Sequence, residues 1–190
     1  MKAYDDANIM ETTVDSKRVF DGLILHIDHI NNRLPNGKLA AREVARHVGA
    51  SAIVPLDAEG NVWLVKQFRA PLGKVLLEVP AGKLDDPQED RLKAAKRELA
   101  EETGLTAASW THLTDIVTGP GFTDERISLY LARELSTGES HPDDDEFLNI
   151  VRVPLEELVA MIGRGEISDS KTICAVMLAD RAVNGQADRV

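Results

Sequence analysis

The amino-acid sequence predicts an α/β (α+β) fold, with a mixed β-sheet covered by helices and a small antiparallel β meander at the N-terminus. Short strand-like runs dominate the middle of the 190-residue chain, helical patterns are interspersed among them, and two helical patterns close it. The length is close to that of one ordinary domain, and 43% apolar residues allow the chain to bury a sizeable core.

The charge balance argues against several function classes. The chain has 22 Lys and Arg against 32 Asp and Glu, a formal net charge of −10. This excess argues against non-specific binding to nucleic acid or to an anionic membrane surface, because both need clustered basic side chains. A polyanionic substrate is compatible only if cations lie between protein and ligand. The single cysteine, Cys174, can form neither an internal disulfide nor a cysteine-type zinc site.

The N-terminus gives no sign of targeting. Residues 1–6 are polar and acidic, unlike a signal peptide, and no apolar run reaches the length of about 18 residues that spans a membrane. The expected location is therefore the cytoplasm.

Residues 1–47 are expected to form an arm and a β meander. Residues 1–15 show no periodicity and are predicted to be a loosely held arm. Apolar residues alternate over 23–27 with the period of a strand. Asn36-Gly37 predicts a hairpin turn, and residues 39–44 a second extended stretch. The meander is too small to bury its own apolar face, so it must pack on the rest of the chain or on a second copy.

The remainder, residues 48–190, is expected to form one domain. The predicted strands lie at residues 52–56, 62–65, 75–79, 113–118 and 126–132, with a further strand ending at Val153. The predicted helices span residues 87–103, 154–163 and about 170–182.

The helix predicted over residues 87–103 has clear start and end signals. Asp86 is the expected N-cap, Pro87 occupies the first helical position, and Glu89 completes a capping box. Gly104 follows the last helical residue, where a left-handed residue commonly ends a helix. An apolar stripe predicts the face that packs on the core: Leu92, Ala95 and Leu99.

Three carboxylates share the opposite face of this helix. Glu98, Glu101 and Glu102 stand at i, i+3 and i+4, where like charges repel by a few tenths of a kcal/mol. The helix dipole also disfavours anions near the C-terminus. Divalent cations relieve both penalties, and Mg²⁺ and Mn²⁺ prefer such clustered carboxylate oxygens. The alternative is a solvated acidic face neutralised by neighbouring basic residues.

The spacing of these residues resembles the Nudix box, a Gly and a Glu followed by Arg-Glu-apolar-x-Glu-Glu-x-Gly-apolar. The matching residues are Glu89, Arg97, Glu98, Leu99, Glu101, Glu102, Gly104 and Leu105. Gly82 stands one residue farther from Glu89 than in the usual pattern, an insertion that the loop before the helix can absorb.

Flanking motifs resemble the ADP-ribose pyrophosphatase branch of the Nudix family. They are Asn36-Gly37 and residues 42–44, 67–69, 77–82 and 119–125. Pro120 lies sixteen residues after Gly104, about where that branch carries a diagnostic proline. The resemblance implies a Nudix-type sheet between helices and Mg²⁺-dependent hydrolysis of ADP-ribose to AMP and ribose 5-phosphate, with Mn²⁺ as a possible substitute. Another nucleotide sugar such as GDP-mannose, or a non-catalytic nucleotide-sensing module, is the alternative.

The resemblance also implies metal ligands and a base. Glu98 and Glu102 would ligate metal with the backbone carbonyl of Ala81, and Glu101 would support the catalytic cluster directly or through water. The general base is expected from an acidic loop beyond the box. Glu146 is the candidate, and it could also ligate a metal; Asp144 is its rival.

The implied substrate contacts come from outside the helix. Arg69 resembles a substrate-binding arginine, whose side chain can pair bidentately with a phosphate. Arg42 would contact the adenine side and Glu125 the terminal ribose, and a surface salt bridge is the alternative for each of the three. Arg97 and Glu89 are expected to form a structural ion pair.

The same branch is similar in exchanging its N-terminal segment across a two-fold dimer. The resemblance therefore implies a homodimer, in which Arg42 could serve the partner's site. The expected ligand is a small nucleotide sugar, with neither nucleic acid nor membrane as a partner.

Overall fold

The computed structural model describes residues 6–138 and 147–185, and the chain divides into two compact units. The smaller unit comprises Met1–His47 and Gly119–Glu125. The larger unit comprises Val48–Thr118 and Arg126–Val190.

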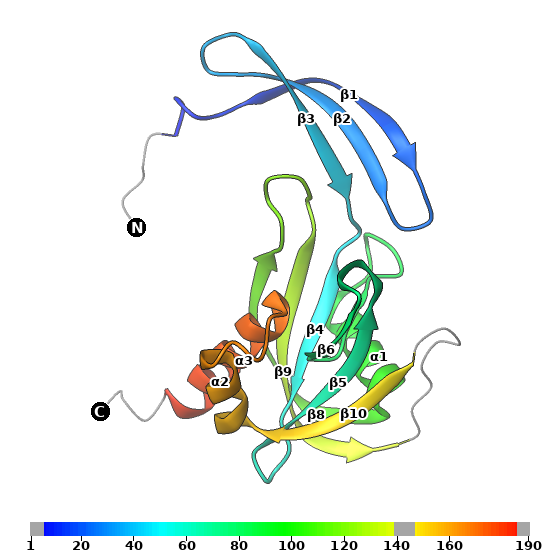
Figure 1. Cartoon of the computed structure of the whole chain (residues 1–190), viewed down its shortest axis with the longest axis vertical. Helices are drawn as coiled ribbons and strands as arrows, with labels where there is room; N and C mark the ends of the chain where they lie inside the picture. The colour runs from blue at the N-terminus through cyan, green and yellow to red at the C-terminus, as the bar shows by residue number, and fades with distance from the viewer. Residues whose placement is uncertain (1–5, 139–146, 186–190) are drawn as a thin grey trace. The chain divides into compact units, whose positions relative to one another are not determined.

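The smaller unit is built on a three-stranded antiparallel sheet in the order β1-β2-β3, shown in blue in Figure 1. Its strands are β1 (Thr12–Asp21), β2 (His26–Arg33) and β3 (Leu39–Arg46). The predicted turn after β2 is confirmed, since Gly37 has a φ of 82° and the Lys38 N–H donates to Asn36 Oδ1 at 3.0 Å.

Two predictions about this unit were wrong. Residues 12–15 belong to β1 and not to a loose arm, and residues 23–25 lie in the hairpin between β1 and β2 and not in a strand. Every residue of β1 is exposed, so no alternation of buried and exposed positions marked the strand in the sequence. The apolar residues of the hairpin happen to be spaced with a period of two, which is why the sequence suggested a strand there.

Backbone hydrogen bonds attach the loop Gly119–Glu125 to the end of β3. The Ala45 N–H donates to the Phe122 carbonyl at 2.7 Å, and the Thr123 hydroxyl donates to the Ala45 carbonyl at 2.9 Å. Arg46 also pairs with Asp124 at 3.0 Å. These contacts place the loop with the N-terminal strands although it begins only at residue 119.

The larger unit contains two sheets, one in the order β7-β4-β9-β8 and one in the order β10-β5-β6. Strands β4 and β9 run parallel whereas β7 and β8 pair antiparallel in the same sheet, so the sheet is mixed as predicted. The strands are β4 (Ala50–Pro55), β5 (Asn61–Arg69), β6 (Lys74–Glu78), β7 (Ala81–Lys83), β8 (Leu105–Val117), β9 (Arg126–Thr137) and β10 (Leu148–Pro154). A short 3₁₀ turn, η1 (Ala70–Leu72), joins β5 to β6.

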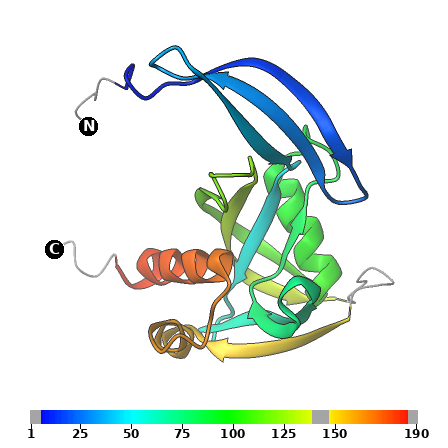
Figure 2. The same cartoon turned by 45° about the horizontal axis from the view of Figure 1, so that its top comes forward.

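Helices cover both faces of β4, as Figure 2 shows with α1 in green and α3 in orange. The helices are α1 (Arg91–Thr103), α2 (Leu155–Gly163) and α3 (Ser170–Asn184). Successive β4 residues point to opposite sides: Val54 packs in one core with Val176 of α3, and Ile53 packs in another with Leu99 of α1. The buried run in the sequence is therefore a strand covered on both faces.

Helix α1 begins later than predicted. Its N-cap is Asp90, whose side chain accepts from the Lys93 N–H at 2.8 Å. Asp86 instead accepts from the Gln88 N–H at 2.6 Å in an exposed turn, so the predicted start at residue 87 was wrong. Both aspartates are N-cap residue types, and a proline after the first suits a turn as well as a helix start. The predicted end was correct, because Gly104 is left-handed with a φ of 69°.

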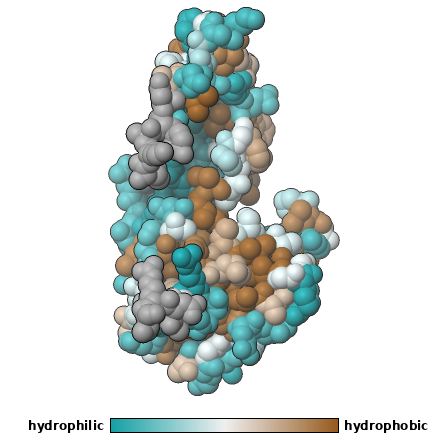
Figure 3. Space-filling view, turned by 90° about the vertical axis from the view of Figure 1, so that its left-hand side faces the viewer, coloured by the Kyte–Doolittle hydropathy of each residue, from teal (hydrophilic) through white to brown (hydrophobic). Residues whose placement is uncertain are grey.

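Apolar side chains reach the surface of both units, as the brown areas of Figure 3 show. The exposed residues of the smaller unit include Phe20, Leu23, Ile24 and Leu25, and those of the larger unit include Phe68, Val75 and Met177. Over the described residues, no helix is both long enough and apolar enough to cross a membrane.

Candidate active site

The last turns of α1 place two carboxylates in the protein interior. Glu98 and Glu102 are only 8% and 4% exposed, whereas the side chain of Glu101 is 38% exposed. Residues four apart lie on one face of a helix, so the two buried carboxylates project together toward β7. Glu102 Oε2 accepts a hydrogen bond from the backbone N–H of Ala81 at 3.1 Å. The helix spacing found in the sequence thus delivers two carboxylates to one short strand.

Gly82 is the point of closest approach between β7 and α1. A Cβ atom on Gly82 would lie 2.0 Å from the carboxyl carbon of Glu98 and 2.1 Å from both of its oxygens. No real side chain tolerates that distance, so the Glu98 carboxylate occupies the space that a larger residue would need. The glycine of the motif is explained here by contact and not by backbone conformation.

Arg97 fixes the carboxylates to the loop before the helix. Its Nη1 atom donates to Glu98 Oε1 at 2.6 Å and to Glu101 Oε2 at 3.0 Å, while Nη2 donates to the Lys83 carbonyl at 3.0 Å. Burial lowers the pKa of Arg97, but the charge of Glu98 and the hydrogen bonds to both glutamates outweigh it and raise the pKa above its ordinary value. The guanidinium therefore stays charged.

The ion pair expected between Arg97 and Glu89 is present, with Nη2 3.5 Å from Glu89 Oε2. The same oxygen of Glu89 accepts from the Asp85 N–H at 2.8 Å. This hydrogen bond, and after it the charge of Arg97, lowers the pKa of Glu89. Among the described residues, Glu89 Oε1 and Arg97 Nε are buried without a hydrogen-bond partner.

The carboxylate oxygens of α1 suit a hard divalent cation, although they do not converge on a single metal position. In the part of the chain that the structure describes, no three His, Cys, Asp or Glu side chains converge on one point. Arg97 instead pairs with one carboxylate oxygen of Glu98 and one of Glu101. Two buried carboxylates beside the backbone of Ala81 and Gly82 nevertheless offer the oxygen ligands that Mg²⁺ and Mn²⁺ favour.

Arg69 has a protein partner that occupies its two-pronged donor set. Its Nε and Nη2 atoms donate to Glu78 Oε1 and Oε2 at 2.8 and 2.7 Å, and Lys171 donates to the same carboxylate. Glu78 is buried, which raises its pKa, but the hydrogen bonds from Arg69 and the charge of Lys171 outweigh this and lower the pKa below its ordinary value. The Arg69 donor atoms that were expected to bind a phosphate are therefore bound to the Glu78 carboxylate.

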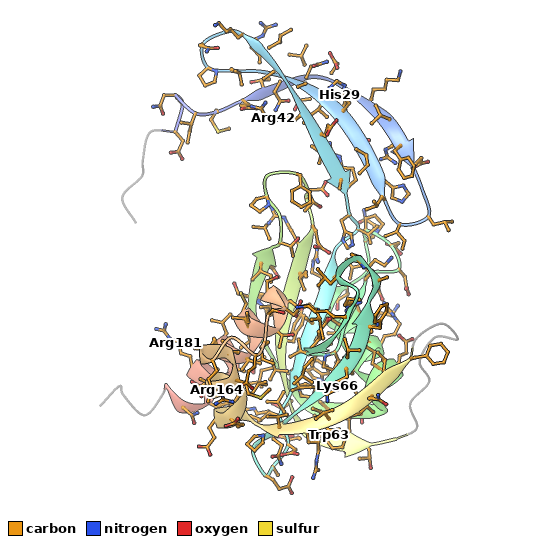
Figure 4. The ribbon with its side chains drawn as sticks, in the orientation of Figure 1. His29, Arg42, Trp63, Lys66, Arg164 and Arg181 are labelled. Carbon is orange, nitrogen blue, oxygen red and sulfur yellow. The ribbon has the colours of Figure 1, made fainter. Side chains whose placement is uncertain are left out.

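The other predicted substrate contacts lie in the smaller unit. Arg42 is on β3, where Figure 4 labels it, and its Nη2 atom donates to Glu11 Oε1 at 2.6 Å. Glu125 pairs with His47 at 3.4 Å. The predicted base Glu146 and its rival Asp144 lie outside the described residues.

A polar network at the start of α3 was not predicted from the sequence. The Thr172 hydroxyl accepts from the Val79 N–H at 2.9 Å and donates to Asp169 Oδ2 at 2.6 Å. Lys171 pairs with Asp169 at 3.1 Å as well as with Glu78. A capping aspartate three residues before a threonine was the available signal, but it predicts only a helix start and not the contact with Val79, 93 residues away.

Two buried glutamates on a helix that packs against a preceding strand with a central glycine are the arrangement expected of enzymes that carry a Nudix box. The NUDIX domain model matches residues 45–176, and the chain belongs to this family of hydrolases.

Several bacterial relatives match most of the chain. The ADP-ribose pyrophosphatase of Bacillus subtilis is 39% identical over 171 residues, covering 89% of this chain and 92% of the relative. The methanol dehydrogenase activator of Bacillus methanolicus is 39% identical over 168 residues, covering 87% of this chain and 90% of the relative. A crystal structure of an ADP compounds hydrolase superposes with a TM-score of 0.81 at 22% identity, covering 95% of this chain and 97% of that one. This last likeness confirms the predicted fold.

Proposed function

We propose that this Nudix hydrolase cleaves the pyrophosphate of ADP-ribose, using Mg²⁺ or Mn²⁺. Water attacks one phosphorus, the bond from that phosphorus to the bridging oxygen breaks, and the products are AMP and ribose 5-phosphate. The observation that carries the proposal is the pair of buried carboxylates, Glu98 and Glu102, packed against Ala81 and Gly82. The substrate is supported by the likeness to the Bacillus subtilis ADP-ribose pyrophosphatase.

In this proposal, Glu98 and Glu102 hold the metal with the carbonyl of Ala81, and Glu101 adds a direct or water-mediated contact. A divalent cation held by these residues would supply charge neutralisation for the pyrophosphate and a lowered pKa for a coordinated water. Arg97 pairs with one carboxylate oxygen of Glu98 and one of Glu101, and it therefore competes with a metal for these two oxygens. It also keeps the two carboxylates oriented before a metal arrives.

The remaining roles concern the proton and the substrate. Glu146 accepts the proton of the attacking water, with Asp144 as the rival base. Arg69 binds a phosphate through the guanidinium surface that Glu78 leaves exposed, since its side chain is 37% exposed. Arg42 and Glu125 stay the proposed contacts to adenine and ribose.

The proposal extends to a cytoplasmic homodimer that uses the β meander as an interface. The exposed apolar residues of the β1–β2 hairpin, Phe20, Leu23 and Leu25, support this assignment because solvent-exposed apolar side chains in a cluster favour protein contact. Light scattering after size exclusion would measure the mass of the particle.

The test is hydrolysis of a panel of ADP-ribose, ADP-glucose, GDP-mannose and NADH, with and without Mg²⁺, with identification of products. We expect AMP and ribose 5-phosphate from ADP-ribose in the presence of Mg²⁺. Glu98→Gln keeps the shape of the side chain and should abolish this turnover. A preference for GDP-mannose would overturn the substrate but keep the metal site. No turnover of any member would favour the nucleotide-sensing alternative, despite the presence of all three box glutamates.

A further inference from the structure

Three neighbouring elements fix the backbone of residues 79–81, the segment that leads into the proposed metal site. The N–H of its first residue donates to Thr172 Oγ1 of α3 at 2.9 Å. The carbonyl of its middle residue accepts from the Ile53 N–H of β4 at 2.9 Å. The N–H of its last residue donates to Glu102 Oε2 of α1 at 3.1 Å. The position of this segment relative to Glu102 therefore depends on α3 and β4 as well as on α1.

The hydrogen bond from Thr172 has a fixed direction. A hydroxyl has one proton, and Thr172 donates it to Asp169 Oδ2 at 2.6 Å, which leaves its lone pairs for the N–H of Val79. Thr172 is fully buried, and Val79 is buried beside it. Without the hydroxyl, this N–H would lose its buried acceptor, and an unpaired buried donor is costly enough to move the segment.

Ion pairs hold the same junction from the side of β6. Lys171 donates to Glu78, the last residue of β6, and pairs with Asp169 at 3.1 Å. Asp169 thus receives the Thr172 hydroxyl, the backbone N–H of Thr172 at 2.9 Å, and Lys171. The first turn of α3 therefore contacts Glu78, the end of β6, through an ion pair and Val79, the next residue, through an uncharged hydrogen bond.

We propose that Thr172, oriented by Asp169, is a positioning residue for the metal site, acting through the backbone of residues 79–81. It touches neither metal nor substrate; it sets where Ala81 and Gly82 lie against Glu102 and Glu98. The inference rests on the proposed function, because it assumes that these glutamates bind a divalent metal.

The experiment measures Mn²⁺ binding by electron paramagnetic resonance in the full-length protein, so that the readout does not depend on turnover. Thr172→Val keeps the side-chain shape and removes the hydroxyl, whereas Thr172→Ser retains the hydroxyl and removes only the methyl group. Val176→Ala is the matched control, because it removes buried packing one turn later on α3 without removing a hydrogen bond to residues 79–81. Thermal unfolding of each variant gives the accompanying loss of stability.

We expect Thr172→Val to weaken Mn²⁺ binding by roughly tenfold, as loss of groups that orient metal ligands typically does. Thr172→Ser and Val176→Ala should bind Mn²⁺ nearly as the unsubstituted protein does. Unchanged binding in Thr172→Val would overturn the inference. So would an equal loss in Val176→Ala at the same melting temperature, because the effect would then follow stability alone.

The same measurements separate this inference from the proposed function. If the unsubstituted protein binds Mn²⁺ but does not hydrolyse ADP-ribose, the proposed substrate fails and the Thr172 comparison still decides the inference. If it binds no Mn²⁺, the metal site and the inference fail together. If it binds Mn²⁺ and hydrolyses ADP-ribose while Thr172→Val behaves identically, only the inference fails.

Discussion

The Glu98 carboxylate lies directly against the backbone of Gly82, where an added Cβ atom would come within 2.0 Å of the carboxyl carbon. Glu98 is a buried residue of α1 and Gly82 the central residue of β7, so this contact joins helix and strand. The missing side chain at residue 82 is thus what allows the carboxylate to reach this position.

Gly82→Ala should therefore displace Glu98 and reduce metal-dependent hydrolysis by at least about tenfold, since misplaced ligands weaken metal sites. Gly163→Ala is the matched control, because a Cβ there meets nothing within 4 Å. Initial rates over a Mg²⁺ titration would measure the effect. Full activity in Gly82→Ala would show that the contact with Glu98 has no part in metal binding.

Arg97→Lys should lower both stability and activity. One ammonium group cannot reproduce the planar fork that contacts Glu98, Glu101 and the Lys83 carbonyl at once. We expect a loss of about 2 kcal/mol in the free energy of unfolding, the usual scale for hydrogen bonds between charged groups. Urea unfolding measures it.

The control for that substitution is Arg181→Lys, on the exposed last turn of α3, where Figure 4 labels the arginine. Its stability should change by less than about 0.5 kcal/mol. Equal losses at both positions would argue that the contacts of Arg97 contribute nothing specific.

Glu78→Gln should destabilise the protein by about 3 kcal/mol at neutral pH, because it leaves Arg69 and Lys171 without their buried counter-charge. The pKa of Glu78 is lowered in the folded state, so its contribution is complete above the unfolded pKa of about 4.3 and is lost as the pH falls below that value.

The stability difference between Glu78→Gln and the unsubstituted protein should accordingly shrink between about pH 5 and about pH 3. Chemical denaturation across this range measures it, and the difference cancels the titration of other carboxylates. A stability difference that stays constant down to about pH 3 would be inconsistent with a charged Glu78 whose pKa is lowered by folding.

Asp90→Ala should cost about 1 kcal/mol, because Asp90 is the N-cap of α1. Asp86→Ala should cost less, since Asp86 closes only an exposed turn. Thermal unfolding of the two variants compares them directly. A larger loss at Asp86 would restore the earlier helix start.

Glu146→Gln should lower kcat by at least about a hundredfold and leave KM nearly unchanged, as expected for loss of a general base. Asp144→Asn is the paired variant, with the same change of charge to neutral amide. Steady-state kinetics on ADP-ribose separates kcat from KM. If Asp144→Asn carries the loss instead, the base is Asp144.

Local signals predicted much of the fold. The buried run at residues 52–56 corresponds to β4, and Gly104 ends α1 as expected. Ala95 and Leu99 pack in the core, as the apolar stripe predicted. Each of these depends on the chemistry of adjacent residues or on helical and strand periodicity, which a sequence displays directly.

The failures have equally physical reasons. β1 is exposed along its whole length, so burial left no period of two to detect. The start of α1 was ambiguous because two aspartates could cap it, and only one of them meets the helical N–H of Lys93. The partner of Arg69 was not predicted, because the β5–β6 register pairs Arg69 with Lys74 and Glu78 with Val65, and only the side chains bring Arg69 and Glu78 together.

The sequence by itself determined that Glu98, Glu101 and Glu102 share one helical face, because helix periodicity is a local property of the chain. Only the tertiary structure decided what that face meets. Packing of α1 beside β7 buries Glu98 and Glu102 against Ala81 and Gly82 and leaves Glu101 at the surface. Such contacts depend on how separate elements pack, so the spacing of residues along the chain cannot specify them.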